Sequence, residues 1–403
     1  MPSSKQRCRA GTLDYLTMNI YVPSTANPQH RLPVMVRIHG GGFVDGSADG
    51  DGGSPTFLLK HDVIVIAINY RLSAYGFMCL NIPEVPGNQG LKDQVLALRW
   101  INENIDAFGG NPKEITVFGD SAGGISVNIH LLSSYETLFQ RAIIQSGSAL
   151  THVWTKDADT TVPVRLAKEL GFSTSDIHKA LGHLSSLDTH TVIKAAHDLT
   201  NVNSFKYKNT LKGPCVVKVL EGIDNFITKH PRDIVTSKVR ITPIIISHND
   251  NAAAVVFQVI DKYFETFNIG DHLKLAFDFD NDVELDAAVE TVRNFYIGEE
   301  KSPENMKRAL TDFVNDFYFD YPTEEMVDQL VANGATVYPY IFSYSGGRNL
   351  MKVPLNMATT GATHGDELGY LYDYEKFGGE AAPDDQLMID RMTTIWTNFA
   401  KFG

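Results

Sequence analysis

Short apolar runs alternate with amphipathic segments along most of the 403-residue chain. The runs are rich in Val, Ile and Phe, which is typical of strands buried on both faces of a parallel sheet. In the segments between them, apolar residues recur every three or four positions, as in helices that pack one side on a sheet. The pattern predicts an α/β fold with a mostly parallel central sheet flanked by helices. The predicted strands are residues 34–38, 63–69, 115–118, 142–145, 242–246 and 337–342, and the predicted helices are residues 91–104, 126–132 and 303–319.

Two stretches depart from this alternation. Residues from about 150 to 235 are irregular and charged, and we expect them to form an insertion of cap and gorge-lining helices. Residues 45–54 are rich in Gly and Asp, and they predict a flexible loop rather than a calcium loop, because they lack the glutamate spacing of an EF-hand. With no internal repeats, residues 1–403 are expected to form a single domain.

A Gly-x-Ser-x-Gly motif connects a predicted strand to a predicted helix. It reads Gly119-Asp-Ser121-Ala-Gly123 and follows the strand at 115–118. A chain that leaves a strand for a helix within about one residue strains the residue at the apex and projects its side chain outward. Glycine on either side leaves room for the turn, because a Cβ there would strike the neighbouring strand or helix. Ser121 is therefore the predicted nucleophile.

A glycine triplet follows the predicted strand at 34–38, in the sequence His39-Gly-Gly-Gly-Phe43. Such a loop lets the backbone approach a ligand and aim N–H groups at a tetrahedral oxyanion. Gly41, Gly42 and Ala122, the residue after the nucleophile, are the predicted donors. A phosphate-binding loop is the alternative, but no Gly-Lys-Ser/Thr follows and no Gly-x-Gly-x-x-Gly spacing is present.

His364 is the predicted general base. It lies in a Gly-rich loop after the last predicted strand, 243 residues beyond Ser121. In α/β-hydrolases the histidine comes last in the chain, after the serine and the acid. The chain has 13 histidines, and this order and loop setting single out His364 among them.

Further motifs extend nearly end to end, and with them the chain resembles the type B carboxylesterase and cholinesterase family of α/β-hydrolases. The elbow and the glycine loop alone would also suit relatives of hormone-sensitive lipase, whereas residues 86–94 and 108–112 favour type B. The resemblance implies the α/β-hydrolase fold and hydrolysis of carboxylic esters through a serine acyl-enzyme, with no cofactor. Residues 363–371 are most similar to insect members. The further motifs are Asn-Ile-Tyr-Val-Pro at 19–23, Asn-Tyr-Arg-Leu at 69–72, Pro-Gly-Asn-Gln-Gly-Leu-Lys-Asp-Gln at 86–94, Phe-Gly-Gly-Asn-Pro at 108–112, Gln-Ser-Gly-Ser at 145–148 and Trp-Thr-Asn-Phe-Ala-Lys at 396–401.

The acid of the catalytic triad departs from the family pattern. Family members usually carry a glutamate on the loop after a strand that here reads Pro-Ile-Ile-Ile at 243–246, and the glutamate position corresponds to Ala252. An alanine cannot orient an imidazole or stabilise an imidazolium. Asp250, two residues earlier, is the alternative acid if the loop is displaced. Disabling the acid of a serine-protease triad lowers kcat by about 10⁴-fold, so weak activity is one expectation.

Other polar residues near these motifs have simpler expected roles. Asp366 and Glu367 are expected to be a solvated turn and helix-start pair. Asp120 is expected to tune the serine electrostatically, to orient water for deacylation, or to satisfy backbone N–H groups at a helix N-terminus. His39 is expected to be a hydrogen-bonding prop for the glycine loop.

The ends of the chain and its cysteines are the features that relate to the cellular compartment of the protein. Relative to the family, the chain is expected to lack N-terminal edge strands and a C-terminal end, and its first residues have no apolar core of a signal peptide. The three cysteines are Cys8, Cys79 and Cys215, and Tyr15 occupies a position where secreted members usually carry a cysteine. A disulfide framework is therefore not expected. The compartment stays open: cytoplasmic as the chain stands, secreted if an N-terminal segment is missing.

Composition limits the partners. The formal net charge is −13, which argues against nucleic acid. No run of about 18 apolar residues predicts a membrane span, and no metal-ligand spacing such as Cys-x-x-Cys or His-Glu-x-x-His is present. The expected partner is a small-molecule ester, with the natural ester and the oligomeric state left open.

The function that these residues predict is carboxylic ester hydrolysis by a serine acyl-enzyme. Two alternatives stay open because of Ala252. One is a non-catalytic, esterase-like binding or adhesion protein. The other is a scavenger that captures esters or organophosphates in a single acylation.

Overall fold

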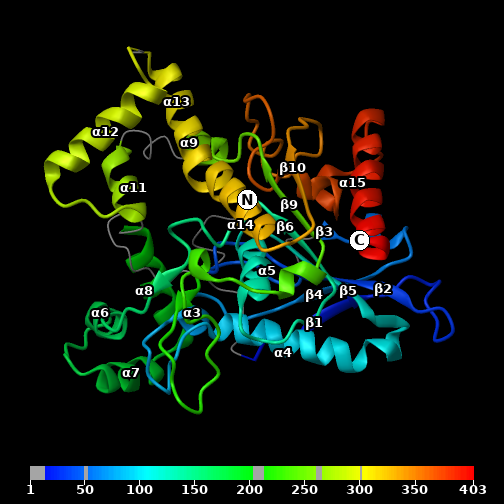
Figure 1. Cartoon of the computed structure of the whole chain (residues 1–403), viewed down its shortest axis with the longest axis horizontal. Coiled ribbons are helices and arrows are strands. Elements are labelled where there is room, and N and C mark those ends of the chain that lie inside the picture. Colours follow the sequence, from blue (N-terminus) through cyan, green and yellow to red (C-terminus); the bar gives the residue numbers. More distant parts are fainter. Residues whose placement is uncertain (1–13, 50–52, 203–212, 260–265, 300–301) are drawn as a thin grey trace.

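A seven-stranded sheet runs through the computed structural model, which describes residues 14–49, 53–202, 213–259, 266–299 and 302–403 (Figure 1). The strand order is β1-β4-β2-β5-β6-β9-β10. β1 is antiparallel to β4, and every other neighbouring pair is parallel. The predicted mostly parallel sheet is thus confirmed. The strands are β1 Met18–Tyr21, β2 Leu32–Ile38, β4 Ile64–Ile68, β5 Gly110–Asp120, β6 Arg141–Gln145, β9 Ile244–Asn249 and β10 Val337–Phe342.

All six strands predicted from apolar runs belong to this sheet. β5 is longer than its apolar run at both ends, and β9 extends three residues beyond the predicted end, through Asn249. The sequence pattern missed β1, because it is only four residues long and all of them are half-buried. Its antiparallel pairing closes one edge of the sheet.

The two faces of the sheet bury different sets of residues. Val34, Val36 and Ile38 of β2 belong to the core on the face covered by α4 (Gln89–Asn104) and α5 (Ala122–Leu132). Met35 belongs to the core on the other face, since successive side chains of a strand point to opposite sides. Both helices agree with the predicted ones, although α5 begins four residues earlier.

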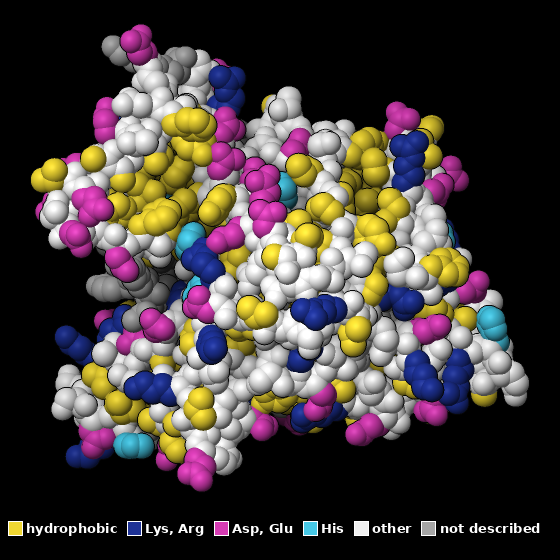
Figure 2. Space-filling model, in the orientation of Figure 1, with side chains coloured by type: hydrophobic (Ala, Val, Ile, Leu, Met, Phe, Trp, Pro, Cys, Tyr) yellow, Lys and Arg dark blue, Asp and Glu magenta, His cyan; other side chains and the backbone are white. Residues whose placement is uncertain are grey.

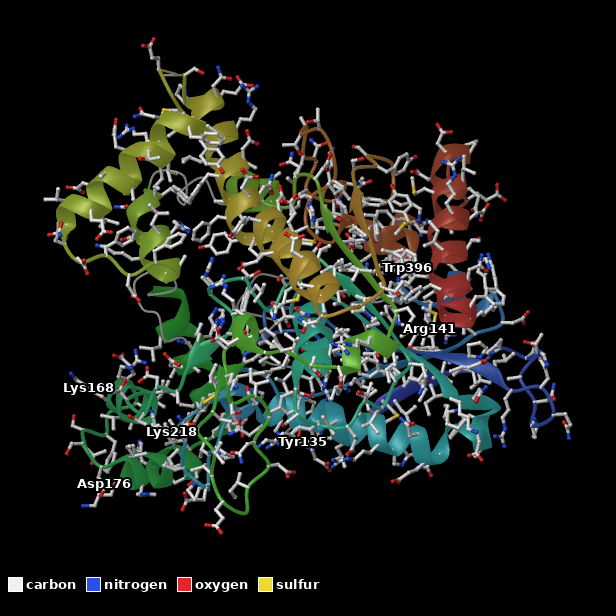
Figure 3. The ribbon with its side chains drawn as sticks, viewed as in Figure 1. Tyr135, Arg141, Lys168, Asp176, Lys218 and Trp396 are labelled. Carbon is white, nitrogen blue, oxygen red and sulfur yellow. A yellow bond between two sulfur atoms is a disulfide. The ribbon has the colours of Figure 1, made fainter. Side chains whose placement is uncertain are left out.

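The second face is covered by α15 (Pro383–Phe402) and by the segment that precedes it, residues 366–377. Trp396 of α15 is fully buried there. Arg141, at the start of β6, donates a hydrogen bond of 3.2 Å to the carbonyl of Lys401 near the end of α15, and so joins this helix to the sheet (Figure 3). A buried face on each side gives the three layers of an α/β fold.

Residues 303–319, predicted to form one helix, are helical, but the helix type changes from α to π within them. α13 (Pro303–Asn315) continues as a π-helical segment, Asp316–Asp320, and then as α14 (Tyr321–Ala332). A π-helical turn inside an α-helix is uncommon and is often found at functional sites. Here it carries Phe319, whose ring contacts the loop of His364 described below.

Two groups of helices project from the sheet in Figure 1. The segment expected to form a cap contains α6 (Val162–Glu169), α7 (Ile177–Ser185) and α8 (Thr189–Val202). The other group is α11 (Ile269–Ala276), α12 (Asp282–Tyr296) and α13, over which hydrophobic side chains gather in Figure 2. The remaining elements are α2 Thr56–Leu59, α3 Ser73–Phe77, α9 Ala254–Val259 and two short pairs of strands, β3 Gly53–Ser54 with β11 Asp373–Tyr374 and β7 Lys156–Asp157 with β8 Cys215–Val216.

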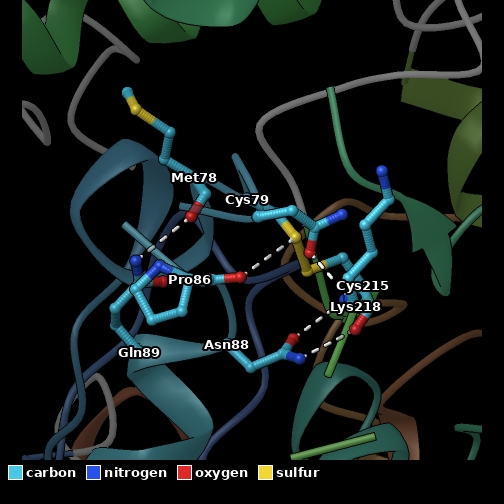
Figure 4. Close-up of a disulfide and its surroundings, with 8 residues drawn as sticks. Met78, Cys79, Pro86, Asn88, Gln89, Cys215 and Lys218 are labelled. Carbon is cyan, nitrogen blue, oxygen red and sulfur yellow. Dashed lines mark hydrogen bonds between the residues drawn. A yellow bond between two sulfur atoms is a disulfide. The ribbon is translucent and has the colours of Figure 1, made fainter. Parts of the chain in front are cut away.

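A disulfide bond joins Cys79 to Cys215 (Figure 4). The expectation that the cysteines form no disulfide is therefore wrong for this pair, and Cys8 lies outside the described residues. Asn88 fixes the second cysteine, because its side chain donates to the carbonyl of Cys215 at 2.7 Å and accepts its N–H at 2.8 Å. The two cysteines are 136 residues apart, so only the folded chain brings them together.

A membrane span was not expected from the composition. Within the described ranges, no helix is both long enough and apolar enough to cross a bilayer.

Candidate active site

Ser121 occupies the turn between β5 and α5 in a strained conformation. Its φ of 56° and ψ of −121° lie in a region that a residue with a side chain rarely adopts. The backbone holds it there, because the Ser121 N–H donates to Gln145 O at 2.8 Å and its carbonyl accepts from the Ile125 N–H at 2.9 Å. Its side chain is partly exposed and makes no capping hydrogen bond to α5. The hydroxyl is thus presented at the end of the strand, as a nucleophile elbow requires.

The glycines around Ser121 are needed for close packing. A Cβ on Gly123 would lie 2.0 Å from the carbonyl oxygen of Ile38, and a Cβ on Gly119 would lie 2.6 Å from the same atom. The elbow is therefore pressed against the end of β2, from which the glycine loop departs. This contact brings the predicted nucleophile and the predicted oxyanion loop to the same edge of the sheet.

The glycine loop turns sharply at Gly41 and Gly42, whose φ angles are 107° and 60°. The carbonyl of Gly41 accepts hydrogen bonds from the N–H groups of Val44 and Asp45. Among the hydrogen bonds of the described residues, none uses the N–H of Gly41 or Gly42, and Ala122 is the first residue of α5, where N–H groups lack a partner within the helix. These three donors are free to bind an oxyanion.

His39 supports this loop, as predicted. Its Nδ1 lies 2.8 Å from Gly40 O, its ring stacks on Tyr70 at a centroid distance of 4.4 Å, and the Tyr70 hydroxyl donates to His39 O. Burial lowers the pKa of His39 to about 4. The imidazole is therefore neutral at physiological pH, and it holds the loop rather than exchanging protons.

The loop of His364 pairs with the loop that follows β9. The His364 N–H donates to the carbonyl of Ala252 at 3.2 Å, and the Thr363 hydroxyl donates to the same oxygen at 3.1 Å. The Asn251 N–H donates in turn to Ala362 O. Ala252, which is fully buried, thus lies directly beside the predicted base, where the family pattern calls for a carboxylate.

The imidazole of His364 has one nitrogen without a partner. Nδ1 is buried and makes no hydrogen bond to any described residue, while the ring contacts that of Phe319 at a centroid distance of 5.0 Å. Burial lowers the pKa of His364, and the charges of Asp120 and Asp366 oppose that shift. Within the described chain, no hydrogen bond joins His364 to the Ser121 hydroxyl, a contact that in free enzymes often tightens only when substrate binds.

Asp250, the alternative acid, is engaged with the backbone. Its carboxylate accepts the Ala362 N–H at 2.7 Å, and a Cβ on Gly361 would lie 2.4 Å from the same oxygen. It makes no hydrogen bond to His364 Nδ1. The observed contacts make Asp250 a support of the His364 loop.

Asp366 and Glu367 begin a short 3-10 helix, Asp366–Tyr370, as expected, but they are buried, so the expectation that they are solvated is wrong. Asp366 is 0% exposed and accepts four hydrogen bonds, three from backbone N–H groups and one from Asn349. Glu367 is 1% exposed and accepts from Gln145 and Asn249. The loop folds inward because these carboxylates satisfy donors that would otherwise be buried without partners.

Asp120 pairs with a residue that sequence reasoning did not consider. Arg37 Nη2 lies 3.6 Å from Asp120 Oδ1; the side chain of Arg37 is buried and that of Asp120 is 14% exposed. Asp120 Oδ1 makes no hydrogen bond to any described residue, so the expected satisfaction of helix N–H groups is not observed for this oxygen. The available signal was an arginine within the apolar run of β2, where a charge needs a partner.

The burial of Glu367 predicts a pH effect on stability. Desolvation raises its pKa to about 7 from 4.5, so the folded protein keeps a proton that the unfolded chain releases between these values, and the free energy of unfolding falls as pH rises through that window. Glu367→Gln removes the titration. Relative to wild type, its free energy of unfolding should therefore rise by about 2 kcal/mol between pH 5 and pH 8, as measured by urea denaturation.

The exposed Glu380→Gln, on the surface of the chain, is the matched control for this measurement. Its difference from wild type should be the same at both pH values. An equally constant difference for Glu367→Gln would contradict the raised pKa.

The elbow and the glycine loop lie at the carboxyl ends of parallel strands, and the loop of the predicted base pairs with the loop that follows β9. Together with the sheet order, they define an α/β-hydrolase. Among the described residues, no group of three or more His, Cys, Asp or Glu is arranged to hold a metal ion.

Comparisons with known proteins give the family. A sequence profile described as "Carboxylesterase family" matches residues 2–403, and the chain belongs to this family of serine carboxylic ester hydrolases. Esterase FE4 of Myzus persicae is 32% identical over 410 residues, covering 98% of this chain and 71% of the relative. Juvenile hormone esterase of Tribolium castaneum is 31% identical over 422 residues, covering 98% and 71%.

A solved structure agrees with the fold. The crystal structure of juvenile hormone esterase from Manduca sexta with OTFP covalently attached superimposes with a TM-score of 0.85 at 29% identity, covering 98% of this chain and 76% of that one. The resemblance to insect esterases inferred from the motifs is confirmed.

Proposed function

We propose that Ser121 and His364 hydrolyse carboxylic esters without a triad carboxylate, and that turnover is consequently slow. The observation that carries this proposal is the strained elbow at Ser121, whose φ is 56°. Strain of this kind persists only where the surrounding structure enforces it, and it is concentrated at functional sites.

In the acylation step, His364 takes the proton of the Ser121 hydroxyl as its oxygen attacks the ester carbonyl. The tetrahedral oxyanion then accepts hydrogen bonds from the N–H groups of the glycine loop and of Ala122. Preorganised donors of this kind are worth about 10²–10³-fold in kcat each. His364 returns the proton to the departing alcohol, and an acyl-Ser121 ester remains.

In the deacylation step, His364 activates water in the same way and the acid is released. Both steps pass through a His364 imidazolium, which a triad carboxylate would stabilise and whose tautomer it would fix. The His364 Nδ1 is buried without a partner, which supports a reduced rate of both acylation and deacylation. If the rate of deacylation is reduced more than the rate of acylation, the acyl-enzyme accumulates and the protein acts as a single-turnover acceptor.

The proposed substrates are small esters. Two relatives named above are juvenile hormone esterases, which favours esters with an apolar body over charged ones. The hydrophobic side chains over α11–α13 agree with this preference. Phe277, directly after α11, and Phe317, in the π-helical segment, contact the ring of His152 at centroid distances of 5.9 and 5.8 Å.

Hydrolysis of p-nitrophenyl butyrate by the wild type and by Ser121→Ala tests the proposal. Steady-state turnover by the wild type and a loss of at least 10²-fold in Ser121→Ala are expected, because only the elbow serine forms the acyl-enzyme. Ser185→Ala, an exposed serine on α7, should leave the rate unchanged.

The time course and the mass of the protein separate the alternatives. A burst equal to the enzyme concentration without further turnover, with the acyl group found on Ser121, would indicate the single-turnover acceptor. A folded wild type without any Ser121-dependent reaction would overturn the proposal and favour a binding protein.

A further inference from the structure

The imidazole of His364 lacks the group that usually orients the base of a serine hydrolase. The His364 N–H donates to the carbonyl of Ala252 at 3.2 Å, but this backbone bond leaves the side chain free to rotate. Its Nδ1, which a triad carboxylate would hold, is buried and makes no hydrogen bond to any described residue. The base must still point a ring nitrogen at the Ser121 hydroxyl, because proton transfer depends on this geometry. Another contact therefore has to fix its rotation.

The ring of Phe319 packs against this imidazole. The two ring centroids lie 5.0 Å apart, with an angle of 44° between the planes, within the range of about 4.5–7 Å that favours aromatic pairs. Among the described residues, no other aromatic ring contacts that of His364, and both residues are half-buried. A neighbour packed against a side chain limits the rotamers that it can adopt. Phe319 is thus placed to hold the imidazole in one orientation.

Pro322 favours the π-helical turn that precedes it. Proline has no N–H, so it cannot donate to the carbonyl of Tyr318, four residues earlier, as an α-helix would require. The Tyr321 N–H instead donates to the carbonyl of Asp316, five residues back. The carbonyl of Tyr318 accepts the Thr151 hydroxyl at 3.2 Å. The turn that carries Phe319 is therefore written into the sequence by a proline and is satisfied by a donor from outside the helix.

Two further hydrogen bonds attach this turn to the active site. The Ser148 hydroxyl donates to the carbonyl of Pro322 at 2.6 Å, and Ser148 lies shortly after β6, the neighbour of β5 in the sheet. Asn315, at the end of α13, accepts the N–H of Ala253 at 2.7 Å through its side-chain oxygen. Ala253 belongs to the loop that pairs with the loop of the base. The turn is therefore fixed both beside the elbow and beside the base.

A third contact holds the residue next to Phe319. His248, near the end of β9, places its Nε2 3.2 Å from Asp320 Oδ1, and its side chain is only 7% exposed. Adjacent residues of the turn thus contact two histidines: Phe319 contacts His364, and Asp320 contacts His248. The turn is held from the sheet as well, which limits how far Phe319 can move away from the imidazole.

We infer that Phe319 is a positioning residue for ester hydrolysis: its ring holds the His364 imidazole in the orientation that reaches the Ser121 hydroxyl, a task that the carboxylate performs in a complete triad. This inference rests on the proposed function of Ser121 and His364. Phe319 carries no charge and exchanges no proton, so it supplies the orientation that the missing acid would give but not the stabilisation of the imidazolium. That difference agrees with the slow turnover proposed above.

The first test measures the motion of the His364 ring directly. The NMR order parameter of its Cε1–H group, assigned through His364→Gln, should fall from about 0.85, typical of a rigid group, to below about 0.6 in Phe319→Ala. Phe319→Tyr keeps the ring and should retain the value of the wild type. If Phe319→Ala does not fold, Phe319→Leu, which is apolar but has no planar ring, takes its place with the same expectation. An unchanged order parameter in the folded variant would overturn the inference.

The matched control is Phe377→Ala. Phe377 is also half-buried and packs on other side chains, those of Arg348 and Tyr374, but it lies in the segment that covers the second face of the sheet. Its replacement should leave the order parameter of His364 and kcat unchanged. An equal fall of the order parameter in Phe377→Ala would show that any lost ring loosens the protein, and it would also overturn the inference.

The second test is a double-mutant cycle on kcat for p-nitrophenyl butyrate. Phe319→Ala should lower kcat about 10- to 100-fold with little change in KM, because a misplaced base slows the chemical step. In the Ala252→Glu background, where a carboxylate orients the imidazole, the same change should cost less than about 3-fold. Equal losses in the two backgrounds, or a raised KM with unchanged kcat, would overturn the inference. Absence of Ser121-dependent turnover in the wild type would instead overturn the proposed function, and the NMR measurement would still decide the role of Phe319.

Discussion

Ala252→Glu is expected to raise kcat for p-nitrophenyl esters by up to about 10⁴-fold, the factor lost when the acid of a serine-protease triad is disabled. The carbonyl of Ala252 already accepts the N–H of His364, and the imidazole Nδ1 is buried without a partner. A glutamate at this position would accept a hydrogen bond from Nδ1, fix the tautomer that leaves Nε2 free to act as base, and stabilise the imidazolium. Steady-state kinetics on the folded variant measures the gain.

The gain should come with a loss of stability. Ala252 is fully buried, and a larger side chain in a packed core costs about 1–3 kcal/mol. Ala252→Gln is the matched control, since it has the same size and no charge and should be destabilised without the gain in kcat. A folded Ala252→Glu with the kcat of the wild type would show that the missing carboxylate is not what limits this enzyme.

Asp366→Asn is expected to lower the free energy of unfolding by about 3 to 5 kcal/mol. One oxygen of Asp366 accepts the N–H groups of Met351 and Lys352, and the other accepts the Thr363 N–H and the Asn349 amide. An asparagine replaces one of these oxygens by a donor, so two buried donors lose their acceptor and face an NH₂ group. Urea denaturation measures the loss.

The same substitution should abolish ester hydrolysis even while the protein remains folded. Thr363 precedes the predicted base, His364, and its N–H, bound to Asp366, holds the loop in place. Asp286→Asn, an exposed carboxylate on α12, is the control and should change stability by less than about 0.5 kcal/mol. A loss below about 1 kcal/mol for Asp366→Asn would contradict a structural role for this carboxylate.

The parts of the fold that could be predicted from the sequence are those with local signals. A strand buried on both faces reads as an apolar run whatever its partners, so β2 and β4 were recognisable. The elbow was recognisable because its glycines are required by the close approach of Gly123 to the carbonyl of Ile38. The position of Ala252 beside His364 followed from the family pattern.

The parts that could not be predicted depend on which distant residues meet. The charge of Arg37 is explained only by Asp120 on the next strand, and the burial of Asp366 only by donors from residues 349–352. The sequence shows that such a residue is polar, but it does not show which distant residue is its partner. For the same reason, acidic residues beside His364 suggested a solvated turn, whereas four donors draw Asp366 inside.

The bond between Cys79 and Cys215 bears on how the protein must be produced. The two sulfur atoms can meet only after the chain has been synthesised past residue 215, since the two cysteines are 136 residues apart. Cells that keep their cytosol reducing will yield the two thiols instead, and the loop after α3 will then not be joined covalently to β8. Preparations from an oxidising secretory compartment and from a bacterial cytosol are therefore two chemically different samples, and kinetics measured on one should not be assigned to the other.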